Sequence, residues 1–243
     1  MKRVALITGG AKGIGRAIGI DLAGRGWSVA FCYRTSITEA KTAWDAMRAK
    51  GAEALAEHCD VSDPVACEAF VRKVREQLGP IDALVNCAGP YVRIPLLDQS
   101  IESWREQFDD NLHPVFYLSK LVAQEMVERS WGRILNFSMA NADQMVGQPN
   151  VTAHYISKAA ILILTRTLAK ILGPHGVTVN AISPGFIASG SSPDEELQKM
   201  TKYIPAGYVG EVSDVVSAAR FLLSDEARYV NGSNLHLSGG WGV

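Results

Sequence analysis

The sequence predicts an α/β fold in which a mostly parallel sheet of about seven strands is covered by helices on both faces. Short runs of β-branched and other apolar residues alternate along the chain with longer stretches of helical periodicity. The runs are apolar almost throughout, as in strands that helices cover on both sides. The 243 residues, 47% of them hydrophobic, are enough to bury a sizeable core. No linker, repeat or low-complexity segment divides the chain, so we expect residues 1–243 to form a single domain.

The first quarter of the chain contains three predicted strands and two predicted helices. The apolar run at 3–8 predicts a buried strand, which a glycine-rich turn and a helix over about 13–25 follow. A second strand is predicted over 27–33, and a helix over 37–50 ends at a glycine. Residues 54–59 predict a weaker third strand.

Proline marks two boundaries in the next part of the chain. Pro64 stands in a first helical turn, so a helix is predicted over 64–78, and a fourth strand follows at 81–86. The apolar periodicity over 101–129 predicts a long helix that is interrupted near Pro114.

Strands and helices continue to alternate through the remaining sequence. A fifth strand is predicted over 133–137, and a strongly apolar helix over 153–172. A sixth strand over 177–182, a helix over 213–224 and a short seventh strand over 234–237 complete the pattern.

The balance of charges gives no electrostatic reason to expect a nucleic acid or an anionic membrane as a partner. Lys and Arg number 24 against 25 Asp and Glu, a net charge of −1. No apolar run approaches the roughly 20 residues that span a bilayer, and the chain reaches Gly9 too soon for a secretory signal peptide. We therefore expect a cytoplasmic protein.

The cysteines predict neither disulfides nor a metal site. Cys32, Cys59, Cys67 and Cys87 form no CxxC pair and no ligand spacing with histidine. We interpret them as small, reduced residues of the core.

A glycine-rich turn follows the first predicted strand and opens the first predicted helix. Residues 8–18 read Thr-Gly-Gly-Ala-Lys-Gly-Ile-Gly-Arg-Ala-Ile. Glycines let the backbone turn tightly and approach a pyrophosphate, whose charge is stabilised by the amides at the helix N-terminus. The turn therefore predicts a dinucleotide site.

Further motifs stand in order along the chain: Thr8-Gly9-x-x-x-Gly13-x-Gly15, Asp60-Val61, Asn86-Cys87-Ala88-Gly89, Asn111, Pro184-Gly185 and Gly239-Gly240. With these motifs the sequence resembles the short-chain dehydrogenase/reductase family in its classical form, and within it the 3-oxoacyl-(acyl-carrier-protein)-reductase-like members. The resemblance covers essentially the whole chain. It implies a Rossmann-type fold, an oxidoreductase and a nicotinamide cofactor.

The resemblance also implies which residues hold that cofactor. They come from the glycine turn, the ends of the strands and the lysine of the catalytic helix. The expected cofactor-binding residues are Gly9, Lys12, Gly13, Ile14, Gly15, Arg34, Asp60, Val61, Asn86, Ala88, Gly89, Lys158, Pro184, Gly185 and Ile187.

The end of the second strand favours NADPH over NADH. Sites of this type that select NADH place a carboxylate there, whereas sites for NADPH place cations near the 2′-phosphate. Here the strand is followed by Arg34, Thr35 and Ser36, and Lys12 lies in the glycine turn. A guanidinium forms planar, charge-assisted contacts with phosphate.

The catalytic residues depart from the pattern of the family. Its members use a tyrosine acid, a lysine four residues later and a serine after strand five, with an asparagine on a neighbouring helix. Lys158 and Asn111 match the lysine and the asparagine. The position four residues before Lys158 holds His154, and the position of the serine holds Met139, with Ser138 before it.

Three interpretations of the proton transfer remain open. His154 could be the donor, because the ordinary pKa of histidine, about 6.5, suits acid catalysis near neutrality. Tyr155 could reach the site if the start of its helix were rewound. In the third interpretation neither residue transfers a proton. Asn141 or Asp143 could also enter the site from the loop before His154.

These alternatives lead to two functions. The first is an NADPH-dependent reductase of a small molecule that contains a carbonyl or a carbonyl-conjugated alkene. The second is a catalytically inactive subunit that binds the cofactor or assembles with an active chain of the same family.

The substrate side is predicted less fully. The resemblance implies a lid over about 188–205, which is rich in glycine and serine near its start. Tyr91, Met145, Tyr203 and Tyr208 are possible walls of the substrate pocket. The two long helices predicted from residue 101 and from residue 153 carry more apolar surface than one sheet face needs. We therefore expect a homodimer or homotetramer, or a heteromer with an active chain.

Overall fold

The computed structural model describes residues 2–190 and 194–243, and within them the main sheet has seven strands in the order β3-β2-β1-β4-β5-β6-β9. Every neighbouring pair is parallel, as the sequence predicts. The strands are β1 (Val4–Thr8), β2 (Ser28–Tyr33), β3 (Ala54–His58), β4 (Ala83–Asn86), β5 (Gly132–Phe137), β6 (Val177–Pro184) and β9 (Asn234–Leu237).

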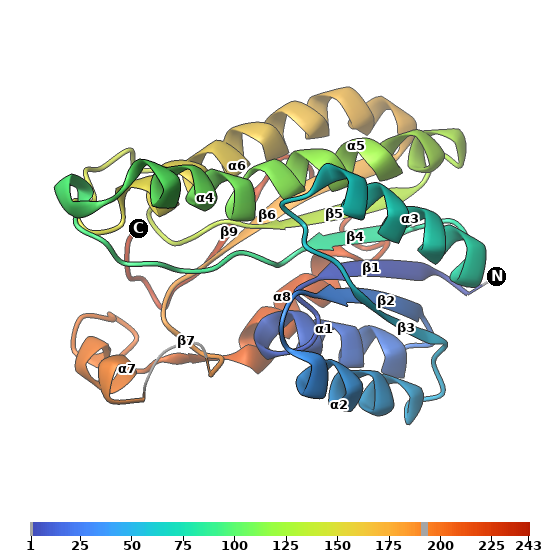
Figure 1. The fold of residues 1–243 in the computed structure, drawn as a ribbon, viewed down its shortest axis with the longest axis horizontal. Coiled ribbons are helices and arrows are strands. Elements are labelled where there is room, and N and C mark those ends of the chain that lie inside the picture. The colour runs from blue at the N-terminus through green and yellow to red at the C-terminus, as the bar shows by residue number, and fades with distance from the viewer. Residues whose placement is uncertain (1, 191–193) are drawn as a thin grey trace.

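Helices form a layer on each side of this sheet (Figure 1). The first layer contains α1 (Gly13–Gly24), α2 (Ile37–Arg48) and α8 (Val212–Leu222). The second layer contains α3 (Pro64–Leu78), α4 (Ile101–Asn111), α5 (His113–Glu128) and α6 (Thr152–Leu172). This is the doubly wound, Rossmann-type arrangement that the sequence predicts, and the carboxyl ends of all main-sheet strands share one edge.

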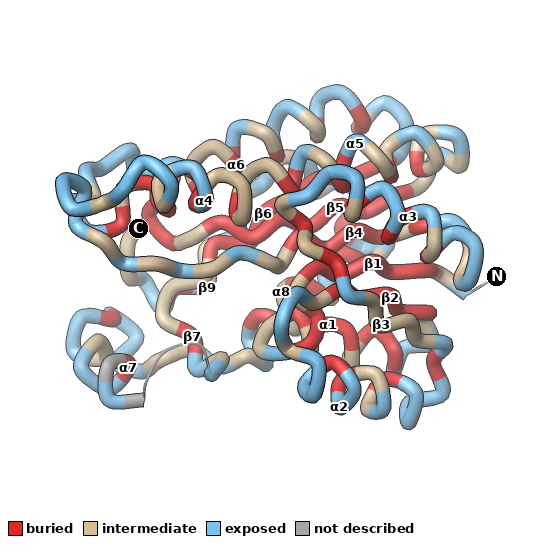
Figure 2. The backbone as a smooth tube through the Cα atoms, viewed as in Figure 1, coloured by how far each residue is buried: buried red, intermediate tan, exposed pale blue. Residues whose placement is uncertain are grey.

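The two cores follow from the alternation of side chains along each strand. In β1, Ala5 and Ile7 pack with residues of α1, α2 and α8. Val4 and Leu6, which point to the opposite face, pack with residues of α3, α5 and α6. All four are buried, and Figure 2 shows the same burial along the neighbouring strands.

Local capping explains where several helices begin and end. The Asp63 carboxylate accepts a hydrogen bond from the N–H of Val65 (2.9 Å), and Pro64 occupies the first turn of α3. The predicted interruption near Pro114 is a break at Leu112, which separates α4 from α5. No described helix is long and apolar enough to cross a membrane.

Several short elements were not predicted. The strands β7 (Ile187–Ala188) and β8 (Gly210–Glu211) pair in a separate small sheet, and α7 (Asp194–Thr201) lies between them in sequence. Two 3₁₀ turns, Leu96–Asp98 and Gly173–His175, were also missed. The predicted lid at 188–205 contains α7, while Ser191, Ser192 and Pro193 lie outside the described residues.

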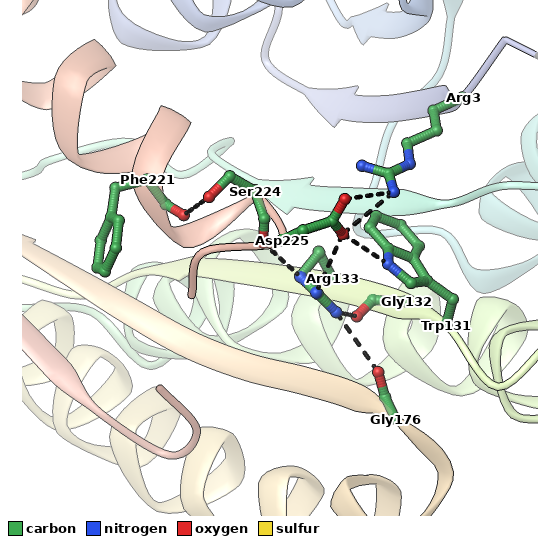
Figure 3. Close-up of polar contacts among 8 residues, drawn as sticks. All are labelled: Arg3, Trp131, Gly132, Arg133, Gly176, Phe221, Ser224 and Asp225. Atoms are coloured by element: carbon green, nitrogen blue, oxygen red, sulfur yellow. Dashed lines mark hydrogen bonds and ion pairs between the residues drawn. The ribbon is translucent and has the colours of Figure 1, made fainter. Parts of the chain in front are cut away.

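A buried arginine joins several elements where the amino ends of the strands lie (Figure 3). The Arg133 guanidinium donates hydrogen bonds to the carbonyls of Ser224 (3.1 Å) and Gly132 (2.8 Å) and lies 3.7 Å from the Asp225 carboxylate. The same carboxylate accepts hydrogen bonds from the guanidinium of Arg3 (2.9 Å) and from the indole N–H of Trp131 (3.0 Å). The contacts tie the start of β1 and β5 to the segment that follows α8, at the opposite edge from the glycine turn.

Candidate active site

Glycines shape the turn between β1 and α1. Gly9 and Gly13 have positive φ angles of 66° and 55°, which glycine adopts without strain. A Cβ at Gly15 would stand 2.6 Å from the carbonyl oxygen of Gly9. The Thr8 hydroxyl accepts hydrogen bonds from the N–H groups at 87 (3.0 Å) and 88 (2.9 Å), which holds the turn against the end of β4. Among the residues that the structure describes, no side chain caps the N-terminus of α1, so its amides remain available to an anion.

A pocket of about 580 Å³ opens beside this turn, at the carboxyl ends of β1, β2, β3 and β4. Most of the predicted cofactor-binding residues line it. They are Gly9, Lys12, Gly13, Ile14, Gly15, Arg34, Asp60, Val61, Ala88 and Gly89.

The other predicted cofactor residues lie outside this wall. Asn86 is buried and donates a hydrogen bond to Asn136 (2.8 Å). Pro184 ends β6, and a Cβ at Gly185 would stand 2.9 Å from the Cα of Ser238. Ile187 is buried in β7, and the chain then reaches the pocket wall two residues later.

Arg34 lies at the end of the pocket that β2 and β3 form. Its guanidinium pairs with the carboxylates of Asp110 (3.0 Å) and Asp60 (3.7 Å) while half of the side chain stays exposed. Thr35 and Ser36 line the same region. Sequence reasoning missed Asp110, because its pairing with a residue of another element leaves no local pattern.

Lys158 and Asn111 meet at Gly89, on the edge of the pocket. A Cβ at Gly89 would stand 3.3 Å from the Lys158 Nζ and 2.5 Å from the Asn111 Oδ1. The Lys158 ammonium is buried and donates a hydrogen bond to the carbonyl of Phe137 (3.2 Å). Burial lowers the pKa of Lys158 to about 8.

Only the N–H groups of the Asn111 side chain have hydrogen-bond partners among the described residues. Its amide N–H groups donate to the carbonyls of Gln107 (3.0 Å) and Pro90 (3.3 Å). Its Oδ1 is buried and accepts no hydrogen bond from the described residues. A buried acceptor without a partner is costly, so this atom is placed to receive a donor from a ligand or a water.

His154 lies on α6 one turn before Lys158, as the spacing predicts, and is buried. Its ring makes an edge contact with Tyr91, with centroids 5.2 Å apart and planes at 89°. Burial and the nearby charge of Lys158 lower the pKa of His154 to about 3, although the Pro90 carbonyl acts in the opposite direction. The imidazole is therefore neutral at pH 7, and its buried Nδ1 has no hydrogen-bond partner among the described residues.

The Tyr155 hydroxyl is engaged by the loop after β5. It donates a hydrogen bond to the carbonyl of Asn141 (2.8 Å) and accepts one from the N–H of Val146 (3.1 Å). The Tyr155 ring packs with Leu162 and other buried apolar residues. Tyr155 thus holds the loop after β5, and the structure does not bring its hydroxyl together with the Lys158 ammonium.

The residues around the family's serine position are also engaged elsewhere. The Ser138 hydroxyl donates to the backbone carbonyl of Lys158 (2.8 Å), inside the core. Met139 packs against the cluster that contains Tyr155. Asp143 pairs with His236 (2.9 Å) on β9. The described residues therefore place no hydroxyl from this stretch beside His154.

Of the four residues predicted as walls of the substrate pocket, only one lines the pocket described above. Tyr91 lines the pocket. Met145, Tyr203 and Tyr208 are exposed and do not line the described pocket. Within the described residues, no group of three or more His, Cys, Asp or Glu side chains could hold a metal ion.

Comparisons with known proteins agree with this geometry. Residues 9–242 match the family described as Enoyl-(Acyl carrier protein) reductase. A 3-oxoacyl-(acyl-carrier-protein) reductase FabG of Staphylococcus aureus is 34% identical over 243 residues, which cover 99% of this chain and 98% of the relative.

Two solved structures show the same fold over nearly the whole chain. A variant of a Serratia marcescens short-chain dehydrogenase/reductase superposes with a TM-score of 0.93 at 30% identity, covering 99% of this chain and 98% of the other. A variant of actinorhodin polyketide ketoreductase with NADPH has a TM-score of 0.93 and 30% identity, covering 99% and 97% of the two chains.

Proposed function

The chain belongs to the short-chain dehydrogenase/reductase family of oxidoreductases, and on that premise we propose that it uses NADPH to reduce a carbonyl-conjugated alkene, with an activated carbonyl as the second choice. The observation that carries the choice of acceptor is the neutral, buried His154 in the position of the family's tyrosine acid.

The described residues fit NADPH. The glycine turn and the uncapped amides of α1 suit the pyrophosphate. A side chain at Gly9 would press on Ala88, and one at Gly15 would press on the carbonyl of Gly9, so glycine keeps the turn tight. Arg34, with Lys12 in the facing turn, suits the 2′-phosphate. The actinorhodin relative is described with NADPH. When bound, NADPH supplies the hydride.

Lys158 and Asn111 would hold the nicotinamide ribose and the water beside it. The Lys158 ammonium and the Asn111 oxygen both reach Gly89, which lines the pocket. Because burial lowers the pKa of Lys158 to about 8, the ammonium is mostly charged at pH 7 and can also stabilise negative charge on the substrate.

The proton donor decides which acceptors react. A neutral imidazole is a poor acid, and Tyr155 is bonded to the loop after β5. Reduction of an isolated ketone places charge on one oxygen and needs a strong acid beside it. In a carbonyl-conjugated alkene the charge spreads away from the carbon that receives the hydride, so the missing acid matters less.

For such a substrate the protein has to orient the reacting groups but does not have to supply a strong acid. Tyr91 and His154 offer an aromatic and imidazole wall beside the pocket. The Staphylococcus aureus relative is named a 3-oxoacyl reductase and the actinorhodin relative a ketoreductase, which supports the activated carbonyl as the second choice.

We also propose that the chain assembles with itself through the outer layer that α5 and α6 form. Ile156, Ile163 and Ile171 on α6 and Phe116 on α5 are exposed. Exposed apolar side chains repeated along one helix are typical of subunit interfaces. A cytoplasmic site of action agrees with the four reduced cysteines.

Turnover of a matched pair of substrates tests the proposed function. Cyclohex-2-enone and cyclohexanone have the same ring, and NADPH oxidation is followed with each at equal concentration. We expect the enone to react at least ten times faster than the ketone. NADPH binding without turnover of any carbonyl or enone would overturn the proposal and would favour an inactive partner subunit.

A further inference from the structure

Three cysteine side chains meet at the adenosine end of the proposed cofactor pocket. Cys32 lies on β2, Cys59 follows β3 and Cys67 lies on α3. The three side chains belong to one packed cluster of buried residues, in which the Cys59 thiol interacts with the other two thiols. The sequence predicts these residues as separate parts of the core, and only the packing of α3 against the strands brings them together.

The backbone holds this cluster in place. The N–H of Cys59 donates a hydrogen bond to the carbonyl of Tyr33 (3.0 Å), which continues the pairing of β3 with β2. The Cys67 thiol donates to the carbonyl of Val61 (3.3 Å). The three sulfurs therefore lie on elements whose positions the sheet and α3 fix.

Two members of the cluster border the pocket, and both are buried, Cys59 slightly less completely (4% exposed) than Cys32 (1%). Both Cys32 and Cys59 line the pocket wall, next to Asp60 and Val61. Cys67 is fully buried behind them. A small oxidant that enters the pocket therefore meets Cys59 with two further thiols beside it.

The surroundings of the thiols also distinguish Cys59 from the third cysteine of the pocket wall. The neighbouring thiol of Cys32, with a smaller effect from Cys67, lowers the pKa of Cys59, while burial opposes the shift. Cys87 lines the same pocket but stands outside the cluster, and burial raises its pKa to about 12. A thiolate is the reactive form of cysteine, so the two pocket cysteines should differ in reactivity.

We propose that Cys59 is a peroxide-sensitive thiol whose oxidation closes the adenosine end of the pocket. Its thiolate attacks one oxygen of a hydroperoxide, the O–O bond breaks, and the products are a sulfenic acid at Cys59 and an alkoxide or hydroxide that takes a proton from water. The thiol of Cys32 or Cys67 then displaces the hydroxyl, which forms a disulfide and releases water.

Either oxidised form changes the wall beside Asp60 and Val61, two of the residues that the resemblance to the family implies as cofactor-binding. We therefore expect oxidation to weaken NADPH binding, and bound NADPH to shield Cys59. The inference uses the pocket of the proposed function but not the reaction, so an inactive protein that still binds NADPH would leave it standing.

Peroxide treatment of the reduced, full-length chain tests the proposal. NADPH affinity is measured by fluorescence before treatment, after hydrogen peroxide, and after dithiothreitol. We expect at least a tenfold loss of affinity that dithiothreitol reverses, with mass spectrometry locating a disulfide that includes Cys59. Cys59→Ser should keep its affinity in peroxide, whereas Cys87→Ser should respond as the unchanged chain does.

An alkylation measurement on the unchanged chain covers the case in which Cys59→Ser fails to fold. With iodoacetamide we expect Cys59 to be modified faster than Cys87, and saturating NADPH to slow that modification. Equal rates at both cysteines, or a loss of affinity in peroxide that persists in folded Cys59→Ser, would overturn the proposal. A reduced chain that does not bind NADPH would instead count against the proposed function, while the order of alkylation would still test Cys59.

Discussion

His154 is buried and neutral in the folded protein, so its contribution to the free energy of unfolding depends on pH. Its pKa is about 3 when folded, against an ordinary value of about 6.5 in the unfolded chain. Below pH 6.5 the unfolded state binds a proton that the folded state does not bind. Stability from this residue is therefore present above pH 6.5 and is lost as the pH falls toward 3.

We predict that lowering the pH from 6.5 to 5 costs the unchanged chain about 2 kcal/mol of unfolding free energy relative to His154→Phe. Urea denaturation of both proteins at several pH values measures the difference. The exposed His175, substituted as His175→Phe, is the control for replacing a histidine by phenylalanine on the surface. Parallel curves for His154→Phe and the unchanged chain would show that His154 is not buried as a neutral group.

We propose that Arg34 determines the choice between the two nicotinamide cofactors. A charge-assisted hydrogen bond contributes about 1.5–3 kcal/mol, or about a 10- to 150-fold change in affinity. We predict that Arg34→Ala weakens NADPH binding by a factor in this range and leaves NADH binding within about twofold.

Fluorescence titration of both cofactors measures the effect. Asp110→Asn is the matched control, because it removes a carboxylate that competes for the same guanidinium and should strengthen NADPH binding. Equal losses for NADPH and NADH in Arg34→Ala would mean that the guanidinium does not contact the 2′-phosphate.

At the scale of elements, the residues around Arg133 hold the amino ends of the strands to the end of α8. Replacing this arginine leaves the carbonyls of Gly132 and Ser224 without their donor in a buried site. We predict that Arg133→Leu lowers the unfolding free energy by about 2–4 kcal/mol.

Thermal and urea unfolding give the measurement. Arg75→Leu, which removes an ion pair to Glu125 on the surface, is the control and should have a much smaller effect. Equal destabilisation by both substitutions would contradict the structural role of Arg133.

The sequence predicts the long elements well, because each has its own periodicity and its own boundary residues. Pro64 begins α3, and the break near Pro114 separates α4 from α5. The missed elements lack such signals. β7 and β8 have two residues each and pair only because the chain returns from α7, and α7 itself is short and polar.

The residues of the candidate site also fall into those that a local sequence pattern predicts and those that it does not. The glycine turn, Arg34 and the spacing of His154 and Lys158 are local patterns, and the structure places their residues at or beside one pocket. The pairing of Arg34 with Asp110, the bonding of Tyr155 to the loop after β5 and the cysteine cluster depend on contacts between distant segments. No pattern within one segment could predict them.

At the scale of the whole molecule, we expect the exposed apolar side chains of the second helix layer to mediate assembly. A hollow of about 710 Å³ lies in that layer between α3 and α5 and is lined partly by Phe116 and Tyr117. We predict a dimer or tetramer at micromolar concentration, and a smaller species for Ile163→Glu, because a charge would be buried in the interface.

Sedimentation velocity measures both proteins, with the exposed Lys41 of α2 substituted as Lys41→Glu for comparison. A monomer for the unchanged chain, or an assembly that Ile163→Glu leaves intact, would contradict this prediction.

The central claim is that the missing tyrosine acid at position 154 determines which acceptor the enzyme reduces. The most direct measurement restores that acid in His154→Tyr and follows NADPH oxidation with cyclohexanone and with cyclohex-2-enone. We predict that the rate with the ketone rises at least tenfold while the rate with the enone changes by less than about threefold, since general acid catalysis contributes roughly 10²–10⁴-fold where it is needed. An unchanged ratio of the two rates, in a folded variant that binds NADPH as the unchanged chain does, would contradict the claim.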